Sequence, residues 1–188
     1  MRPINRMRIV ISILICSAVS FAQDQANPAK APSTKLEAFQ SRTGVVLIRG
    51  YSIVGTLNGE AGAVSVDARE FRDGSNPNSP KATGISITIK ETGRLERENT
   101  SYIDIDEIDS LVKGIEYISK VTKDVTNLDQ FEVDYRTKGD LRITVFNGTR
   151  GEISARVSSG TIGRTDTFIK LAELDKLREL ILAAKAKL

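Results

Sequence analysis

The 188-residue sequence contains no histidine and a single cysteine, Cys16. Without histidine there is no Ser-His-Asp triad and no imidazole general base. Zinc, copper and haem sites usually rest on His or Cys ligands, so we expect no metal of these kinds and no cofactor. The glycine-rich phosphate motifs GxxxxGK[ST] and GxGxxG are also absent from the sequence.

The N-terminus has the three parts of a secretory signal peptide. Three arginines precede the apolar run Ile9–Val19, and small residues suited to cleavage follow it. We predict cleavage between Ala22 and Gln23, because the apolar run is about half of the roughly 20 residues that a spanning helix needs. Lipid attachment at Cys16 is the alternative, but Ile15 stands where a small residue usually precedes a lipidated cysteine.

Export changes the charge and the chemistry of the mature chain. The full chain has 27 Lys+Arg and 24 Asp+Glu, and removing the three arginines of residues 1–22 leaves 24 of each. A domain with no net charge lacks the excess of basic residues that is typical of nucleic-acid binding. Cleavage also removes Cys16, so no thiol nucleophile remains. We expect a periplasmic or secreted protein with no transmembrane segment in the mature chain.

The exported part divides into a tether and one domain. Residues 23–43 are rich in Ala, Pro, Gln, Ser and Lys, a composition that favours a flexible tether. A short helix around Leu36–Phe39 is its one candidate for order. Residues 44–188 are long enough to bury a core without disulfides and are expected to form a single globular domain.

Apolar periodicity within the domain predicts strands followed by a helix, twice. Period-two alternation predicts four strands in each half, within residues 45–57, 64–69, 85–90, 99–105, 131–136, 141–146, 153–157 and 162–169. Helical spacing predicts amphipathic helices over 105–121 and 171–188. Asp104 and Glu107 resemble a capping box at the start of the first helix.

The two strand-to-helix junctions match at an offset of 66 residues. Five of the fourteen pairs from 102 to 115 are identical, among them Glu107 with Glu173 and Asp109 with Asp175. The sequence therefore predicts a duplicated ββββα unit, with pseudo-repeats over about 45–121 and 130–188. The expected fold is α+β, an antiparallel sheet of about eight strands with both helices on one face. A curled β-barrel closed by the C-terminal helix is the alternative.

The polar face of the second half is the candidate binding surface. Arg136, Arg142 and Arg156 alternate with core residues and, with Asp134, suggest a site for a small anionic ligand or a protein partner. The plain alternative is cross-strand charge pairing. A turn at 137–139 with Gly139 left-handed would place Asp134 opposite Arg142, Arg136 opposite Asp140 and Val133 opposite Ile143.

The densest acidic run is a candidate for carboxylate chemistry, in which two acids serve as general acid and base. It comprises Asp104, Asp106, Glu107 and Asp109, and the alternative is a helix N-terminus that favours acids.

Three functions remain open. An exported, non-enzymatic binding module fits the missing chemistry best. A carboxylate-based hydrolase or isomerase requires acids converging in a pocket. A cell-envelope assembly subunit requires an exposed apolar patch or an uncovered sheet edge.

Overall fold

The structure, a computed structural model, describes residues 31–93, 96–148 and 151–188. The expected signal peptide, its cleavage site at Ala22 and Gln23, and the first part of the expected tether lie outside these residues. Within them, no helix is long and apolar enough to cross a membrane.

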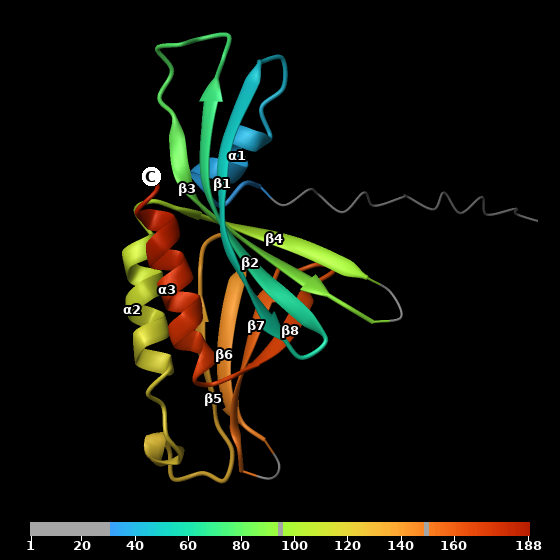
Figure 1. The fold of residues 1–188 in the computed structure, drawn as a ribbon, viewed down its shortest axis with the longest axis vertical. Coiled ribbons are helices and arrows are strands. Elements are labelled where there is room, and N and C mark those ends of the chain that lie inside the picture. Colours follow the sequence, from blue (N-terminus) through green and yellow to red (C-terminus); the bar gives the residue numbers. More distant parts are fainter. Residues whose placement is uncertain (1–30, 94–95, 149–150) are drawn as a thin grey trace, which may run out of the picture. The chain divides into compact units, whose positions relative to one another are not determined.

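Eight strands form two antiparallel four-stranded sheets, each a simple meander (Figure 1). The first sheet contains β1 (Leu47–Gly59), β2 (Gly62–Asp73), β3 (Ala82–Glu91) and β4 (Arg97–Asp104). The second contains β5 (Glu132–Arg136), β6 (Leu141–Asn147), β7 (Ile153–Ser159) and β8 (Thr165–Lys170). The α+β class and the ββββα order of both halves are confirmed. The single eight-stranded sheet was wrong, and the described residues form no closed barrel.

The two sheets meet through packed side chains instead of a continuous hydrogen-bonded ladder. β3 and β4 of the first sheet pack against β7 and β8 of the second. One isolated bridge joins Glu60, at the tip of the β1–β2 hairpin, to Phe168 in β8. A polar contact also crosses the junction, because the buried hydroxyls of Ser101 and Ser159 lie 2.7 Å apart.

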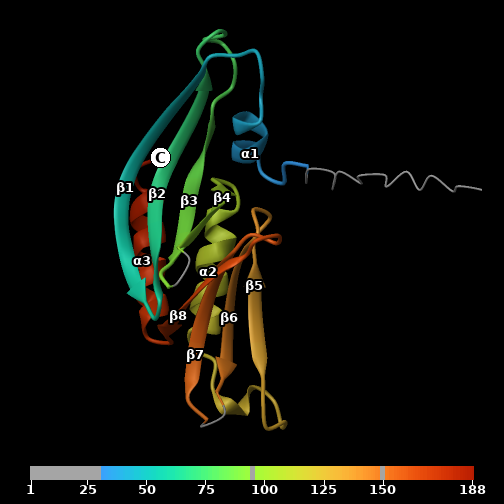
Figure 2. The ribbon, with the colours of Figure 1, turned by 90° about the vertical axis from the view of Figure 1, so that its right-hand side faces the viewer.

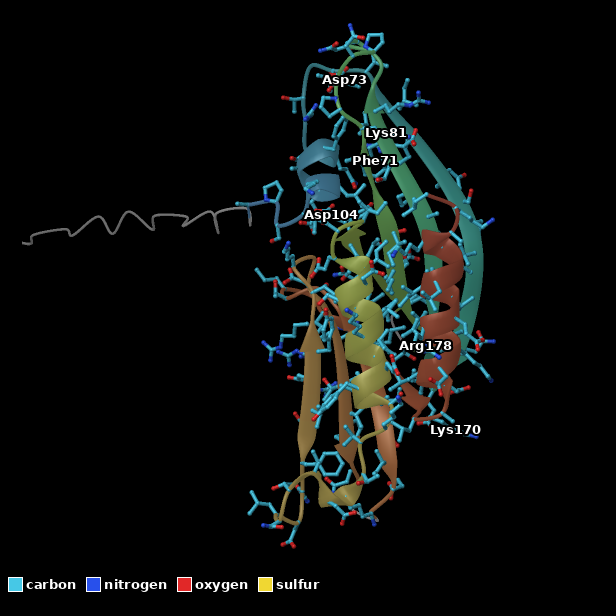
Figure 3. All side chains as sticks on the ribbon, turned by 90° about the vertical axis from the view of Figure 1, so that its left-hand side faces the viewer. Phe71, Asp73, Lys81, Asp104, Lys170 and Arg178 are labelled. Carbon is cyan, nitrogen blue, oxygen red and sulfur yellow. The ribbon has the colours of Figure 1, made fainter. Side chains whose placement is uncertain are left out.

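The helices α2 (Ile108–Ile118) and α3 (Glu173–Lys185) lie side by side in one layer over the sheets (Figure 3). The C-terminal helix α3 packs mainly on β1, β2 and β3 of the first sheet, whereas α2 packs on β5 and on α3. α2 follows the first sheet in sequence but contacts the second, and α3 follows the second sheet but contacts mainly the first. A sheet covered by the helix of its own half, as a simple ββββα repeat predicts, is therefore found in neither half. A short 3₁₀ turn, η1 (Lys123–Val125), follows α2.

A single apolar core joins both sheets and both helices. The matched positions of the two junctions are buried in the same way: Ile108 with Leu174, Leu111 with Leu177, and Ile115 with Ile181, all fully inaccessible. The matched positions are therefore equivalent in burial as well as in sequence.

Gly114 lets α2 approach the second sheet closely. A Cβ at this position would overlap the ring of Tyr135 in β5, whose hydroxyl lies 2.9 Å from Ser110 Oγ. The helix therefore carries a glycine in its interior, although glycine costs about 1 kcal/mol of helix propensity relative to alanine.

We predict that Gly114→Ala destabilises the protein by about 1–2 kcal/mol, because overpacking costs about 1–3 kcal/mol and outweighs the gain in helix propensity. Chemical denaturation measures the difference. Gly93→Ala is the control, since a Cβ at Gly93 meets no atom within 4 Å. A more stable Gly114→Ala protein would show that the Tyr135 ring moves aside without cost.

The opposite face of the first sheet carries helix α1 (Lys35–Gln40) (Figure 2). Leu36 and Phe39 are buried against Phe71 and Ala82 in a second, smaller apolar cluster. The short helix expected around Leu36–Phe39 is confirmed, and this part of the expected tether is packed on the domain.

Asp104 anchors α1 instead of capping α2. Its side chain, 3% exposed, accepts hydrogen bonds from the backbone N–H groups of Lys35, at 2.7 Å, and Leu36, at 3.1 Å. The N-cap of α2 is Glu107, which makes no side-chain capping bond. The predicted capping box was wrong, because the free N–H donors of a distant helix end take the Asp104 carboxylate. Helix α2 also begins at Ile108 and not at residue 105, where the sequence predicted its start.

We predict that Asp104→Asn loosens α1, because the amide keeps only one acceptor oxygen and an unsatisfied buried donor costs about 1–3 kcal/mol. Hydrogen exchange at the amides of Lys35 and Leu36 should accelerate, and trypsin should cut sooner after Lys35 and Arg42. The control is Asp106→Asn, which removes the exposed ion pair with Lys35. Equal acceleration in both variants would contradict the anchoring role of Asp104.

Candidate functional site

The candidate residues of the second sheet lie on its outer face, opposite the core. Arg136 pairs with Arg142, and Asp134 pairs with Thr144, which pairs in turn with Arg156. The neighbouring residues Ile143 and Val157 point into the core with no exposed surface. The structure thus brings Asp134, Arg136, Arg142 and Arg156 onto one face, in two adjacent cross-strand rows.

The β5–β6 register differs from the predicted one by two residues. The loop is 138–140, closed by a hydrogen bond from Thr137 N–H to Leu141 O of 2.9 Å, and the left-handed residue is Asp140, with φ of 62°, instead of Gly139. Asp134 consequently faces Thr144 and not Arg142. A two-residue shift keeps every side chain on its face, which is why the polar surface survives the wrong register.

A contact between distant residues explains the glycine in this loop. A Cβ on Gly139 would overlap the backbone carbonyl of Tyr102 in β4, so Gly139 is required by the packing of the hairpin against the first half. Glycine is needed here because it lets two backbone segments approach closely, and not because the position has a positive φ.

Asp134 organises the arginines around it. Its carboxylate accepts hydrogen bonds from Thr144 Oγ1, at 2.6 Å, and Arg136 Nη2, at 3.2 Å, while Arg142 Nη1 lies 3.9 Å away. Burial raises the pKa of Asp134, but these two hydrogen bonds and the arginine charges outweigh burial and lower the pKa below its usual value. Asp134 is therefore ionised and holds two guanidinium groups in position.

We predict that Asp134→Asn lowers the free energy of unfolding at neutral pH. The folded-state pKa lies below the usual value of 3.8, so the stabilisation is present above pH 3.8 and is lost as pH falls through the lowered pKa. Denaturation at a series of pH values should show the two proteins converging in acid. Asp175→Asn, which removes an exposed carboxylate 3.7 Å from Arg178, is the control. A difference that persists undiminished at low pH would refute this assignment.

A pocket of about 210 Å³ opens at the end of the sheet beside these arginines. Arg136, Arg142 and Arg164 line it, together with Thr137, Asp140, Leu141, Gly160 and Thr161. Arg164 comes from the β7–β8 loop, which is held against the β5–β6 loop by a hydrogen bond from Gly160 N–H to Asp140 O of 3.2 Å. Three arginines from three segments thus line one concavity, together with the acidic Asp140.

Arg164 was missed by the sequence analysis, although a signal for it existed. In a four-stranded meander, the first and third turns lie at the same end of the sheet, so the turn after β7 must adjoin the turn after β5. Arg156, by contrast, does not line the pocket and lies in the adjacent row. Its Nε is buried, as is Ser158 Oγ, and neither atom has a hydrogen-bond partner among the described residues.

The acidic run does not form a site, because its four carboxylates serve different neighbours. Asp104 binds the start of α1, and Asp106 pairs with Lys35 at 2.6 Å. Glu107 accepts from Lys138 N–H at 2.9 Å, and Asp109 pairs with Lys185. In the described part of the chain, no three His, Cys, Asp or Glu side chains gather in a way that would hold a metal ion.

A second groove, of about 530 Å³, lies at the C-terminal end of α2, where Glu116 and Asp124 are among the lining residues. The hydrogen bond from Lys120, followed by its charge, lowers the pKa of Glu116. A general acid requires a raised pKa, so this groove gives the carboxylate-enzyme hypothesis no support.

Comparison with protein-family models, with curated proteins and with solved structures finds no match to this chain.

Proposed function

We propose that this protein is an exported, non-enzymatic binding module that captures an anionic group in the pocket of Arg136, Arg142 and Arg164. The observation that carries the proposal is that three arginines from three segments line one small concavity. Export is supported by the N-terminal sequence features alone.

The donor geometry suits an oxyanion such as a carboxylate or a phosphate. Each guanidinium has five N–H donors in a planar fork, and an acidic partner occupies only some of them. Arg136 gives one hydrogen bond to Asp134, and Arg164 Nε contacts Asp166. Arg142 lies beyond hydrogen-bond distance of Asp134. Since each of these side chains has five N–H donors, the contacts with Asp134 and Asp166 occupy only a minority of them.

The size of the pocket limits what it can hold. Sites for drug-sized ligands occupy about 300–1,000 Å³, whereas this pocket has about 210 Å³. We therefore propose that it takes the anionic end of a ligand, with the remainder of that ligand outside the pocket.

Inorganic phosphate is the simplest probe, followed by amide NMR at constant ionic strength with chloride as the reference. We expect saturable shifts in residues 140–142 and 160–164. Arg136→Gln should weaken binding about threefold to tenfold, because solvent screening at a side chain that is 61% exposed reduces a charged hydrogen bond below its usual value of about 1.5–3 kcal/mol.

Arg72→Gln is the matched control for this measurement. Arg72 is 60% exposed and pairs at 3.2 Å with Glu70, just as Arg136 is 61% exposed and pairs at 3.2 Å with Asp134. Equal weakening in the two variants, or shifts spread evenly over the surface without saturation, would show general charge attraction and exclude this site.

A further inference from the structure

Strand β1 presents an uncovered edge of the first sheet. All six residues from Ile48 to Ile53 are exposed, including the large side chains of Tyr51, at 64%, and Ile53, at 72%. Unpaired N–H and C=O groups along such an edge are a template for another strand. An uncovered sheet edge is also what the assembly-subunit hypothesis predicts.

The other edges of the two sheets are protected. The outer side of β8 is bridged by Glu60, whose N–H donates to Phe168 O at 2.7 Å. β5 is only five residues long and packs on α2, and β4 packs on α1 and on the second sheet. β1, at 13 residues, has a single charged side chain, Arg49, and no proline to discourage pairing.

A bulge defines the part of β1 that can accept a partner strand. The β1–β2 register is regular from Leu47 to Ile53 and shifts between Ile53 and Gly55. A bulge bends the strand and disrupts regular pairing, so residues 47–53 form the regular segment of the edge.

We propose that residues 47–53 pair antiparallel with the same residues of a second copy of this chain, about a two-fold axis at Gly50. Leu47 then lies opposite the second copy's Ile53, and Arg49 opposite its Tyr51. Both pairs occur twice, because a two-fold interface is isologous. The result is a continuous eight-stranded sheet with β1 of each copy at its centre.

Charge and side-chain complementarity favour a second copy as the occupant. A parallel, in-register pairing would set Arg49 beside its own symmetry mate, which is unfavourable. The two-fold at Gly50 instead places each Arg49 against an aromatic ring, an arrangement already present within one copy, where the Arg69 guanidinium lies 5.1 Å from the Tyr51 ring centre. Ile53, which is 72% exposed, gains Leu47 of the second copy as an apolar partner.

Sedimentation velocity of the purified chain over an about hundredfold concentration range tests the proposal. The mass should move from that of one chain toward that of two. Ile53→Lys should hold the protein at the mass of one chain, and Leu128→Lys should leave the association unchanged. The control adds the same charge at a side chain that is 74% exposed, against 72% for Ile53. A single-chain mass at every concentration overturns the proposal and leaves the edge to a strand of another protein. Association that survives Ile53→Lys overturns it as well.

Cross-linking tests the register. In a Cys16→Ser background, Gly50→Cys should form a disulfide between two copies on mild oxidation, since the two-fold places position 50 opposite itself. A Cβ at Gly50 meets its nearest atom, Glu70 O, at 3.6 Å, so the substitution fits the fold. Gly93→Cys, where a Cβ meets nothing within 4 Å, is the control. Equal cross-linking of the two variants overturns the proposed register.

Discussion

The inner face of the first sheet is covered by α3, a helix that the chain supplies only after completing the second sheet. Leu180 of this helix lies over Gly55, at the β1 bulge, where a Cβ would approach the leucine to 2.6 Å. An apolar sheet face must be buried against another element, and neither half of the chain covers its own sheet completely. The two halves therefore share one core, and this sharing fixes which surfaces remain free.

The free surfaces follow from strand alternation. Every second residue of β6 and β7 is committed to the core, so the residues between them are available for polar chemistry. Thr144 and Ser158 show the limit of this division, because they lie in the outer rows and are nevertheless almost fully buried. Arginine stems can cover apolar and polar neighbours while their charged ends reach solvent. The outer face of the second sheet is thus a layer of arginines held by Asp134, and the pocket opens where this layer meets the two turns.

The sequence predicted features governed by local periodicity. The strand order, both long helices and the polar face of β5–β7 follow from residues a few positions apart. Most failures involve partners far along the chain, and the register of the β5–β6 hairpin is a local exception. Asp104 binds N–H groups 68 and 69 residues earlier, and Gly139 accommodates the backbone of Tyr102. The division into two sheets likewise depends on tertiary packing that no local pattern records. Arg164 was missed because the meander that brings it to Arg142 was not used to pair the turns.

The ββββα order that both halves share makes the open edge of β1 informative. In the second half, the equivalent edge strand β5 has five residues, and its Tyr135 packs against Gly114 of α2. A short, packed strand is a standard protection against unwanted pairing. In the first half, the equivalent strand has 13 residues, and the six from Ile48 to Ile53 are all exposed. The edge strand of the second half is thus protected by its short length and its packing on α2, whereas the edge strand of the first half is not. Because the same order of elements protects the edge at β5, the fold does not require an exposed edge at β1. A role of β1 in pairing with another strand explains the exposed edge better.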